Sequence, residues 1–273
     1  MEEKAGRELR VGIAGVAGRM GRALIDAVRA RAGVRLAAAS VRRGTASVPV
    51  GAGGEEEIVA RADPAALFAA SDVVIDFTAP AASVAHAALA AETGTALVIG
   101  TTGLDDRECR AITAAADRAP ILMAANFSLG VNLLLALTRI AASRLGPDYD
   151  LEVLDFHHRH KKDAPSGTAL ALLRAAAQGR GLDPEATPAA LDADRNGVRE
   201  PGGLGFAVLR GGDVVGEHSV ILAGPGERLE LTHRAGDRAI FARGALAAAR
   251  WLADRAPGLY SMADMLGLDA PGG

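Results

Sequence analysis

Residues 9–21 read Leu-Arg-Val-Gly-Ile-Ala-Gly-Val-Ala-Gly-Arg-Met-Gly, an apolar run that leads into a glycine-rich turn. The run has the length and composition of a buried strand, and apolar residues at helical spacing follow over 19–31. The glycines at 15, 18 and 21 let the backbone turn sharply and approach a pyrophosphate at the start of that helix. The stretch therefore predicts the first strand–turn–helix unit of a dinucleotide-binding sheet.

The same alternation continues through the first half of the chain. Apolar runs predict further strands, with helical segments between them, over 34–39, 72–77, 95–100 and 120–124. Strands that alternate with helices at this spacing are typical of βαβ units and a parallel sheet. We therefore expect residues 1–128 to form a Rossmann-like, doubly wound α/β domain that binds a dinucleotide.

The pattern changes after residue 128. One long helix is expected over 129–145, followed by strands over 150–156, 206–210, 213–223 and 228–233. Glycine-rich turns separate the last three strands and suggest an antiparallel meander. This predicts an α+β domain with a mostly antiparallel sheet over 129–238. The C-terminal helical segment, 239–273, is expected to return to the first domain.

Bulk composition limits the classes of protein. The 273 residues are 49% hydrophobic and 23% charged with a net charge of −3, which gives no global reason to bind nucleic acid or an anionic membrane. The single cysteine, Cys109, rules out an internal disulfide and fits a reducing compartment. The charge-free stretch 119–138 has the length of a membrane span, but its polar residues and Pro120 favour a buried strand, loop and helix. A cytoplasmic protein is expected.

Residues 157–168 read His-His-Arg-His-Lys-Lys-Asp-Ala-Pro-Ser-Gly-Thr and hold three of the six histidines and two of the three lysines. Lysine can release and regain a proton, and histidine titrates near neutral pH, so the segment indicates proton transfer as well as positive charge. Its Pro-Ser-Gly-Thr end is typical of a helix start, where free backbone N–H groups attract anions. We predict a pocket that binds carboxylates and protonates its substrate.

The choice of dinucleotide depends on the end of the second strand. An acidic residue there normally binds the ribose 2′-hydroxyl of NAD, but the sequence reads Ser40-Val41-Arg42-Arg43. Two guanidinium groups suit a 2′-phosphate, which favours NADPH and leaves NADH possible. The alternative is that both arginines only solvate a loop.

These segments together resemble the 4-hydroxy-tetrahydrodipicolinate reductase (dihydrodipicolinate reductase) family of bacterial lysine and diaminopimelate biosynthesis. The matching segments follow the family's order and cover nearly the whole chain: 11–21, 76–78, 100–103, 124–128, 157–168, 216–218 and 226–233. The resemblance implies that residues 129–238 bind substrate and form the oligomer. It also implies a homotetramer that reduces a cyclic imine dicarboxylate to tetrahydrodipicolinate with NAD(P)H.

The resemblance also implies roles for individual residues. His157 would be the proton donor and acceptor, Lys161 the second proton donor, and the substrate would be held by His158, Ser166, Gly167 and Thr168. The dinucleotide would contact Gly15, Val16, Ala17, Gly18, Arg19, Met20, Arg42, Gly100, Thr101, Thr102, Ala124, Ala125, Asn126 and Phe127. Many family members carry an acid where this chain has Val41, which argues against efficient use of NADH. Segment 181–203 matches poorly and receives no role.

Other interpretations stay open at this point. Zinc is the main rival for clustered histidines, but Arg159, Lys161 and Lys162 oppose a dication and four ligands are not at hand, so no metal is expected. Another NAD(P)-dependent dehydrogenase of amino-acid metabolism is possible, although an acylating semialdehyde enzyme needs a cysteine nucleophile and Cys109 lies within a predicted helix. The non-enzymatic alternative is a nucleotide-sensing protein without turnover.

The histidines outside the cationic segment receive structural interpretations. His86 and His233 are expected to be structural or surface residues. His218 is expected to form a hydrogen-bonded pair with its neighbour Glu217.

Overall fold

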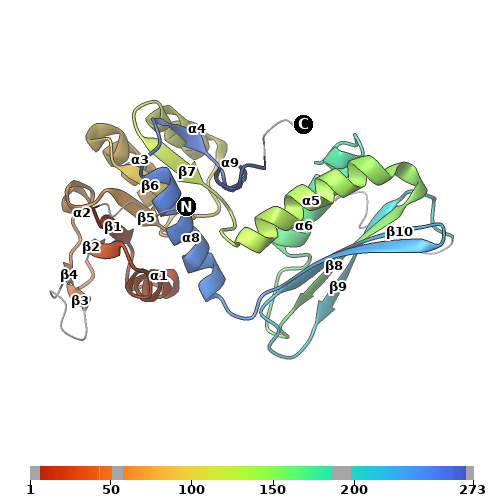
Figure 1. The fold of residues 1–273 in the computed structure, drawn as a ribbon. Helices are drawn as coiled ribbons and strands as arrows, with labels where there is room; N and C mark the ends of the chain where they lie inside the picture. The colour runs from red at the N-terminus through yellow and green to blue at the C-terminus, as the bar shows by residue number, and fades with distance from the viewer. Residues whose placement is uncertain (1–6, 43, 51–57, 186–197, 269–273) are drawn as a thin grey trace. The chain divides into compact units, whose positions relative to one another are not determined.

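The computed structural model describes residues 7–42, 44–50, 58–185 and 198–268. The chain divides into two compact units, one formed by residues 1–128 together with 239–273 and the other by 129–238 (Figure 1). Arg43 and most of the segment that matched the family poorly, 186–197, lie outside the described residues.

The first unit is built on a six-stranded parallel sheet in the order β12-β7-β6-β5-β1-β2. Its strands are β1 (Leu9–Ala14), β2 (Val34–Ser40), β5 (Val73–Asp76), β6 (Ala96–Ile99), β7 (Pro120–Met123) and β12 (Gly258–Tyr260). The chain continues from β1 to β2 on one side and later to β5 on the other side. The carboxyl ends of β1 and β5 therefore meet at a topological switch point, where such sheets bind ligands.

Helices cover both faces of this sheet. Helices α1 (Arg19–Arg29) and α8 (Ala239–Leu252) share one apolar core with Val73 and Ile75, whereas Val74 belongs to the core on the other face. That second core is covered by α2 (Pro64–Ala70), α3 (Pro80–Thr93) and α4 (Asp106–Ala116). Burial on both faces explains why the strands are continuous apolar runs. The doubly wound α/β prediction is confirmed.

Smaller elements complete the first unit. A hairpin of β3 (Val48–Val50) and β4 (Ile58–Ala60) follows β2, and α9 (Met262–Leu266) follows β12. The helix starts follow local sequence rules. Proline occupies the first turn of α2 and of α3, and Asp105 and Glu108 form a capping box at α4.

The second unit contains a four-stranded sheet in the order β11-β10-β8-β9. Its strands are β8 (Asp150–His157), β9 (Leu204–Arg210), β10 (Glu217–Gly224) and β11 (Glu227–Arg234). Strand β10 is antiparallel to both neighbours, whereas β9 runs parallel to β8. The mostly antiparallel α+β domain is therefore confirmed.

The predicted three-strand meander is wrong in one connection. Strand β10 begins at Glu217 rather than 213, and it pairs with β8 instead of forming a hairpin with β9 through Gly211-Gly212. In this register Val220 lies opposite Val153 and Leu222 opposite Leu151, and all four side chains are fully buried. Burial of this apolar face, rather than the glycine turn, decides which strands are neighbours.

Two helices, α5 (Leu129–Leu145) and α6 (Gly167–Gly179), pack on one face of this sheet, and a short 3₁₀ turn (Gly146–Asp148) follows α5 (Figure 1). Residues 129–148 are long and apolar enough to cross a membrane by length and composition alone. Within the unit, however, α5 packs on α6 and β11. The charge-free stretch 119–138 contains β7, a loop and the start of α5, as predicted.

Candidate active site

The glycine turn follows β1 directly. Gly15 adopts a φ of 74°, and its N–H and that of Val16 donate hydrogen bonds to the carbonyl of Ser40 at 2.9 and 3.0 Å. A Cβ on Gly21 would overlap the backbone of the turn, so glycine is required for the helix to start this close to β1. Gly18 is the N-cap of α1 and carries no side chain that could cap the helix. These features fit a backbone cradle for a pyrophosphate.

A buried carboxylate fixes the two loops beside this turn. Asp76, at the end of β5, is fully buried and accepts hydrogen bonds from the backbone N–H of Thr78 at 2.8 Å and from its hydroxyl at 2.6 Å. The second carboxylate oxygen lies 2.8 Å from Nδ1 of His86. Thr101, after β6, accepts from the N–H of Thr78 at 3.1 Å and from the hydroxyl of Ser83 at 2.7 Å. His86 is thus a buried structural partner, one of the two roles expected for it.

The pKa of Asp76 is shifted by this network. Burial alone would raise it, but hydrogen bonds and positive charge from His86, with hydrogen bonds from Thr78 and Ser83, hold the pKa below its usual range. The carboxylate is therefore ionised at neutral pH and stays a pure acceptor.

The other predicted dinucleotide contacts lie at the same edge of the sheet. A Cβ on Gly100 would overlap the ring of Phe77, so glycine lets the loop after β6 approach that ring. Arg42 is exposed two residues beyond β2. The exposed or half-buried members of the set are Gly15, Ala17, Gly18, Arg19, Met20, Arg42, Gly100, Thr102, Ala124, Ala125 and Asn126.

Three members of the set are buried, among them Phe127. Its side chain is 1% exposed and packs edge-on against Phe77, with ring centroids 5.4 Å apart. Val16 and Thr101 are buried as well.

In the second unit the cationic segment begins at the end of β8. His157 is the last residue of the strand and is 9% exposed. Asp155 precedes it by two residues, so both point to the buried face, and His157 Nδ1 lies 2.9 Å from Asp155 Oδ1. The two atoms are close enough for an ion pair but are not aligned as a hydrogen bond.

A turn follows the strand. The N–H of Lys161 donates to the carbonyl of His158 at 3.1 Å, so the extended alternation ends at His157 and does not carry through to Lys161. The Lys161 side chain is 19% exposed and its Nζ lies 2.7 Å from Asp163. His158 is half-buried, with its ring centroid 6.3 Å from that of His160.

Helix α6 begins at Gly167, two residues after Pro165, where the Pro-Ser-Gly-Thr sequence indicates a helix start. Ser166 is the N-cap of α6, and its hydroxyl accepts a hydrogen bond from the N–H of Ala169 at 3.2 Å. Gly167 and Thr168 form the first turn, at the positive end of the helix dipole. The N–H and hydroxyl of Ser166 both donate to Asp155, each at 2.9 Å.

His218 is a member of this site that the sequence did not reveal. Its Nε2 lies 3.3 Å from Oδ1 of Asp155 and 3.2 Å from Oγ of Ser166. The expected pair with Glu217 is wrong, because successive residues of a strand point to opposite faces. Glu217 instead pairs with Arg234 at 3.2 Å.

Burial sets the protonation states here. The pKa of His157 is lowered by burial first, then by the positive charges of His218, Lys161 and Arg210, while Asp155 opposes the shift. Burial would raise the pKa of Asp155, but hydrogen bonds from His218 and Ser166 and the electrostatic interaction with the His157 ring lower it strongly. At neutral pH the free protein therefore holds a neutral imidazole beside a carboxylate.

The charges around Asp155, His157 and His218 bear on whether this site could hold a metal ion. The ligand atoms of Asp155, His157 and His218 lie within 4.8 Å of one another, a spacing that could hold a metal ion. However, Arg210 Nη1 is 3.5 Å from Asp155, and Lys161 acts on His157 from the following turn. This positive charge favours an organic anion over a dication.

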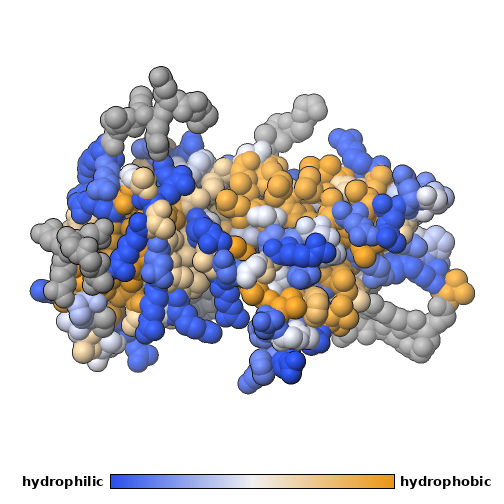
Figure 2. All heavy atoms as spheres, turned by 60° about the horizontal axis from the view of Figure 1, so that its bottom comes forward, coloured by the Kyte–Doolittle hydropathy of each residue, from blue (hydrophilic) through white to orange (hydrophobic). Residues whose placement is uncertain are grey.

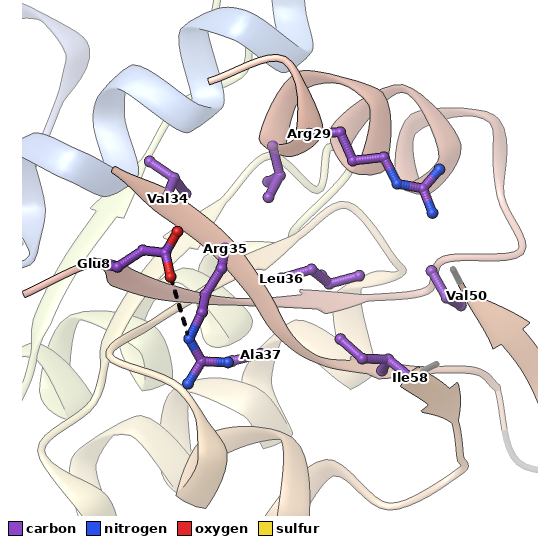
Figure 3. Close-up of a pocket in the computed structure, with 9 residues that line it drawn as sticks. Glu8, Arg29, Val34, Arg35, Leu36, Ala37, Val50 and Ile58 are labelled. Atoms are coloured by element: carbon purple, nitrogen blue, oxygen red, sulfur yellow. Dashed lines mark ion pairs between the residues drawn. The ribbon is translucent and has the colours of Figure 1, made fainter. Parts of the chain in front are cut away.

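A separate cavity of about 340 Å³ lies in the first unit (Figure 3). It is lined by the last turns of α1 and the first half of β2, with Glu8 and Arg35 forming an ion pair at 3.7 Å. The glycine turn and Arg42 belong instead to the carboxyl end of the sheet. The cavity is therefore distinct from the predicted dinucleotide site.

Comparison with known proteins decides the family. Residues 9–127 match the N-terminal family model of dihydrodipicolinate reductase, and residues 130–266 match the C-terminal model. The chain belongs to the dihydrodipicolinate reductase family.

Curated relatives match this chain over almost its full length. The 4-hydroxy-tetrahydrodipicolinate reductase of Thiobacillus denitrificans is 49% identical over 264 residues, which cover 95% of this chain and 99% of its own. That of Rhizobium rhizogenes is 50% identical over 266 residues, 95% of this chain and 97% of its own. A dipicolinate-bound dihydrodipicolinate reductase from Paenisporosarcina sp. TG-14 shares the fold with a TM-score of 0.76 at 23% identity, covering 93% of this chain and 97% of its own.

The activity follows from these relatives. The chain is an NAD(P)H-dependent oxidoreductase that reduces 4-hydroxy-tetrahydrodipicolinate in diaminopimelate and lysine biosynthesis. The alternatives of another dehydrogenase and of a sensor without turnover are set aside. Cys109 lies within α4, as expected of a residue without a nucleophilic role.

Proposed function

We propose that the segment from His157 to Thr168 binds the dicarboxylate substrate of this reductase and transfers the proton. One observation carries the proposal: the candidate proton-transfer group His157 and the first turn of α6 contact the same buried carboxylate, Asp155. Gly167 and Thr168 would hold a substrate carboxylate at the helix start, with His158 beside them. Ser166 would contribute through the helix start that it caps, because its N–H and hydroxyl both donate to Asp155.

The chemistry requires one hydride and one proton. Loss of water from the 4-hydroxylated ring gives the conjugated imine, and bound NAD(P)H would supply the hydride to ring C4 of that imine. The electron pair displaced from the C=C bond then builds negative charge at the adjacent ring carbon, and a proton from Lys161 or His157 quenches it there. His157 is neutral in the free protein, so it becomes a donor only when the negative charge of the bound substrate raises its pKa.

The dinucleotide would lie along the carboxyl edge of the first sheet. The uncapped start of α1 and the glycine turn fit the pyrophosphate. The loops after β6 and β7, at 100–102 and 124–127, would contact the remainder of the cofactor. The hydrogen-bond network of Asp76 supports this assignment, because it fixes the loop that carries Thr101.

NADPH is the preferred cofactor in this proposal. The exposed side chain of Arg42 follows β2 directly, at the place where NAD sites carry an acid. A guanidinium there forms charge-assisted hydrogen bonds with a 2′-phosphate and gains no comparable bond from a ribose hydroxyl.

A cytoplasmic homotetramer is also part of the proposal. Both helices of the second unit lie on one face of its sheet, and the other face carries apolar side chains such as Leu154, Phe156, Ile221 and the 46%-exposed Leu209. Figure 2 shows apolar patches among the hydrophilic surface. Association of copies through this sheet face would remove it from water.

The test is cofactor oxidation by the purified protein with NADPH and NADH in parallel. The substrate is generated in situ from pyruvate and aspartate semialdehyde by the preceding synthase. We expect a higher kcat/KM with NADPH, and Arg42→Ala to reduce that preference about tenfold. Equal values for both cofactors in the unaltered protein would refute the cofactor preference and leave the reductase intact.

A further inference from the structure

Asp155 contacts four separate pieces of the second unit. Its carboxylate accepts two hydrogen bonds from Ser166 at the start of α6. The same group lies beside His157 on its own strand and beside His218 on β10. Arg210, at the end of β9, reaches it at 3.5 Å and also donates a hydrogen bond to the carbonyl of Asp163 at 2.7 Å. The position of one carboxylate therefore affects the His157 ring, the first turn of α6 and the loop between them.

The two nitrogens of the His157 ring face different surroundings. Nδ1 lies 2.9 Å from Asp155. Nε2 lies 3.0 Å from the point where a Cβ on Gly216 would stand, so glycine lets the chain pass close to this nitrogen and any side chain there would crowd it. A proton on Nδ1 would lie beside the carboxylate, in a close ion-pair contact rather than an aligned hydrogen bond, and would leave the lone pair on Nε2.

The charges around the ring single out Asp155. The groups that act on His157 electrostatically are Asp155 on its own strand, His218 on β10, Arg210 on β9 and Lys161 in the following turn. Among these described groups the carboxylate is the one anion. It is therefore the group that favours a positively charged His157 when the ring takes up a proton.

We propose that Asp155 is a positioning residue for the reduction, which holds His157 with Nε2 toward the substrate and fixes the first turn of α6 at the same time. This inference rests on the proposed roles of His157 and of that turn. A carboxylate with a purely structural role would stabilise the fold, but it would not determine the tautomer of His157 or the pH dependence of turnover.

The first test uses the unaltered protein, selectively labelled with ¹⁵N-histidine. Long-range ¹H–¹⁵N spectra report which ring nitrogen carries the proton, and the His157 signals are assigned by their loss in His157→Gln. We expect the Nδ1–H tautomer at pH 7.5. The Nε2–H tautomer would overturn the proposal, and this result does not depend on how any Asp155 variant folds.

The second test is Asp155→Asn, which keeps the shape and removes the charge. We expect kcat at pH 7.5 to fall about 10²-fold and the pH dependence of kcat to shift, with the Kd for NADPH unchanged within about twofold. Asp183→Asn is the matched control: it makes the same substitution at an exposed aspartate of the same unit and should leave kcat unchanged within about twofold.

The outcomes separate this proposal from the one on which it rests. An Asp155→Asn protein with nearly normal kcat, or with reduced kcat and an unchanged pH profile, would assign Asp155 a structural role only. Normal turnover by His157→Gln would instead refute the proposed role of His157 itself. If Asp155→Asn fails to fold, the tautomer in the unaltered protein decides the question.

Discussion

Asp76 in the first unit and Asp155 in the second are two buried carboxylates built on the same plan. Each lies near the carboxyl end of a strand, is fully buried, and accepts hydrogen bonds from both the N–H and the hydroxyl of one residue, Thr78 or Ser166. Each also contacts histidine, and each pKa is lowered because these partners outweigh burial.

The surroundings of the two carboxylates differ. The partner of Asp76 is His86, a buried residue of α3, and the remaining bonds connect Thr78 with Thr101. Around Asp155, by contrast, Arg210 adds a cation, and the Nε2 side of its partner His157 lies close to Gly216. The comparison teaches that the same carboxylate–histidine pair can fix a loop in one place and present a titrating ring in another.

The difference between the two carboxylate–histidine pairs is tested most directly by replacing the histidine of each pair with glutamine. We expect His157→Gln to lower kcat about 10³-fold, because the ring takes part in proton transfer, with Lys161→Ala showing a similar loss. His86→Gln should change kcat at saturating NADPH by less than about threefold and raise the KM for NADPH, because it disturbs only the loop. Steady-state kinetics checks both, and equal losses of kcat in the two histidine variants would remove the distinction.

Asp76→Asn should act mainly on stability. The amide offers one acceptor where the carboxylate has two, so Thr78 or His86 is left without its charged partner in a buried site. We expect the free energy of unfolding to fall by about 2 kcal/mol, measured by urea denaturation. A variant as stable as the parent would show that the loops hold their shape without this network.

Gly216→Ala tests the Nε2 side of the His157 ring. The added methyl group would stand 3.0 Å from Nε2, closer than an ordinary contact, so the ring must shift. We expect kcat/KM to fall about tenfold, consistent with a loss of roughly 1.4 kcal/mol in the transition state. Gly236→Ala is the control, because an added Cβ there meets no atom within 4 Å and should leave kcat/KM unchanged.

The smallest effect expected is on the pH dependence of stability. The pKa of His157 is lowered in the folded state, so below about pH 6.5 the unfolded chain takes up a proton that the native ring resists. The free energy of unfolding should therefore decline from pH 7 to pH 5 on this account. His157→Gln should flatten that decline in urea titrations.

The first sheet was predictable because its strands are buried on both faces and read as continuous apolar runs. Strand β12 was not predicted because Gly258–Tyr260 is only three residues long and carries no strand pattern of its own. It exists because it pairs with the exposed edge of β7. The mispredicted neighbour of β10 has a similar cause, since local turn residues do not reveal which strand will bury an apolar face.

The candidate site was predictable in its titrating residues but not in their arrangement. The composition of the cationic segment predicted His157 and Lys161. It did not predict Asp155, which lies in the alternating strand β8, or His218, which lies in β10, far away in the sequence. A signal for Asp155 was present: in residues 150–157 it occupies the same face as the buried Leu151 and Val153. An acid on the apolar face of a strand requires partners, and here those partners are the site.

The return of the chain to its first unit has a consequence for biosynthesis. Helix α8 supplies part of one core of that unit, and β12 adds the strand that covers the edge of β7. Both are translated after all of residues 129–238, so the second unit can fold on the ribosome while the first still exposes an apolar face and a strand edge. The emerging polypeptide is therefore most prone to misassociation, and most in need of a chaperone, until residues 239–260 have left the exit tunnel.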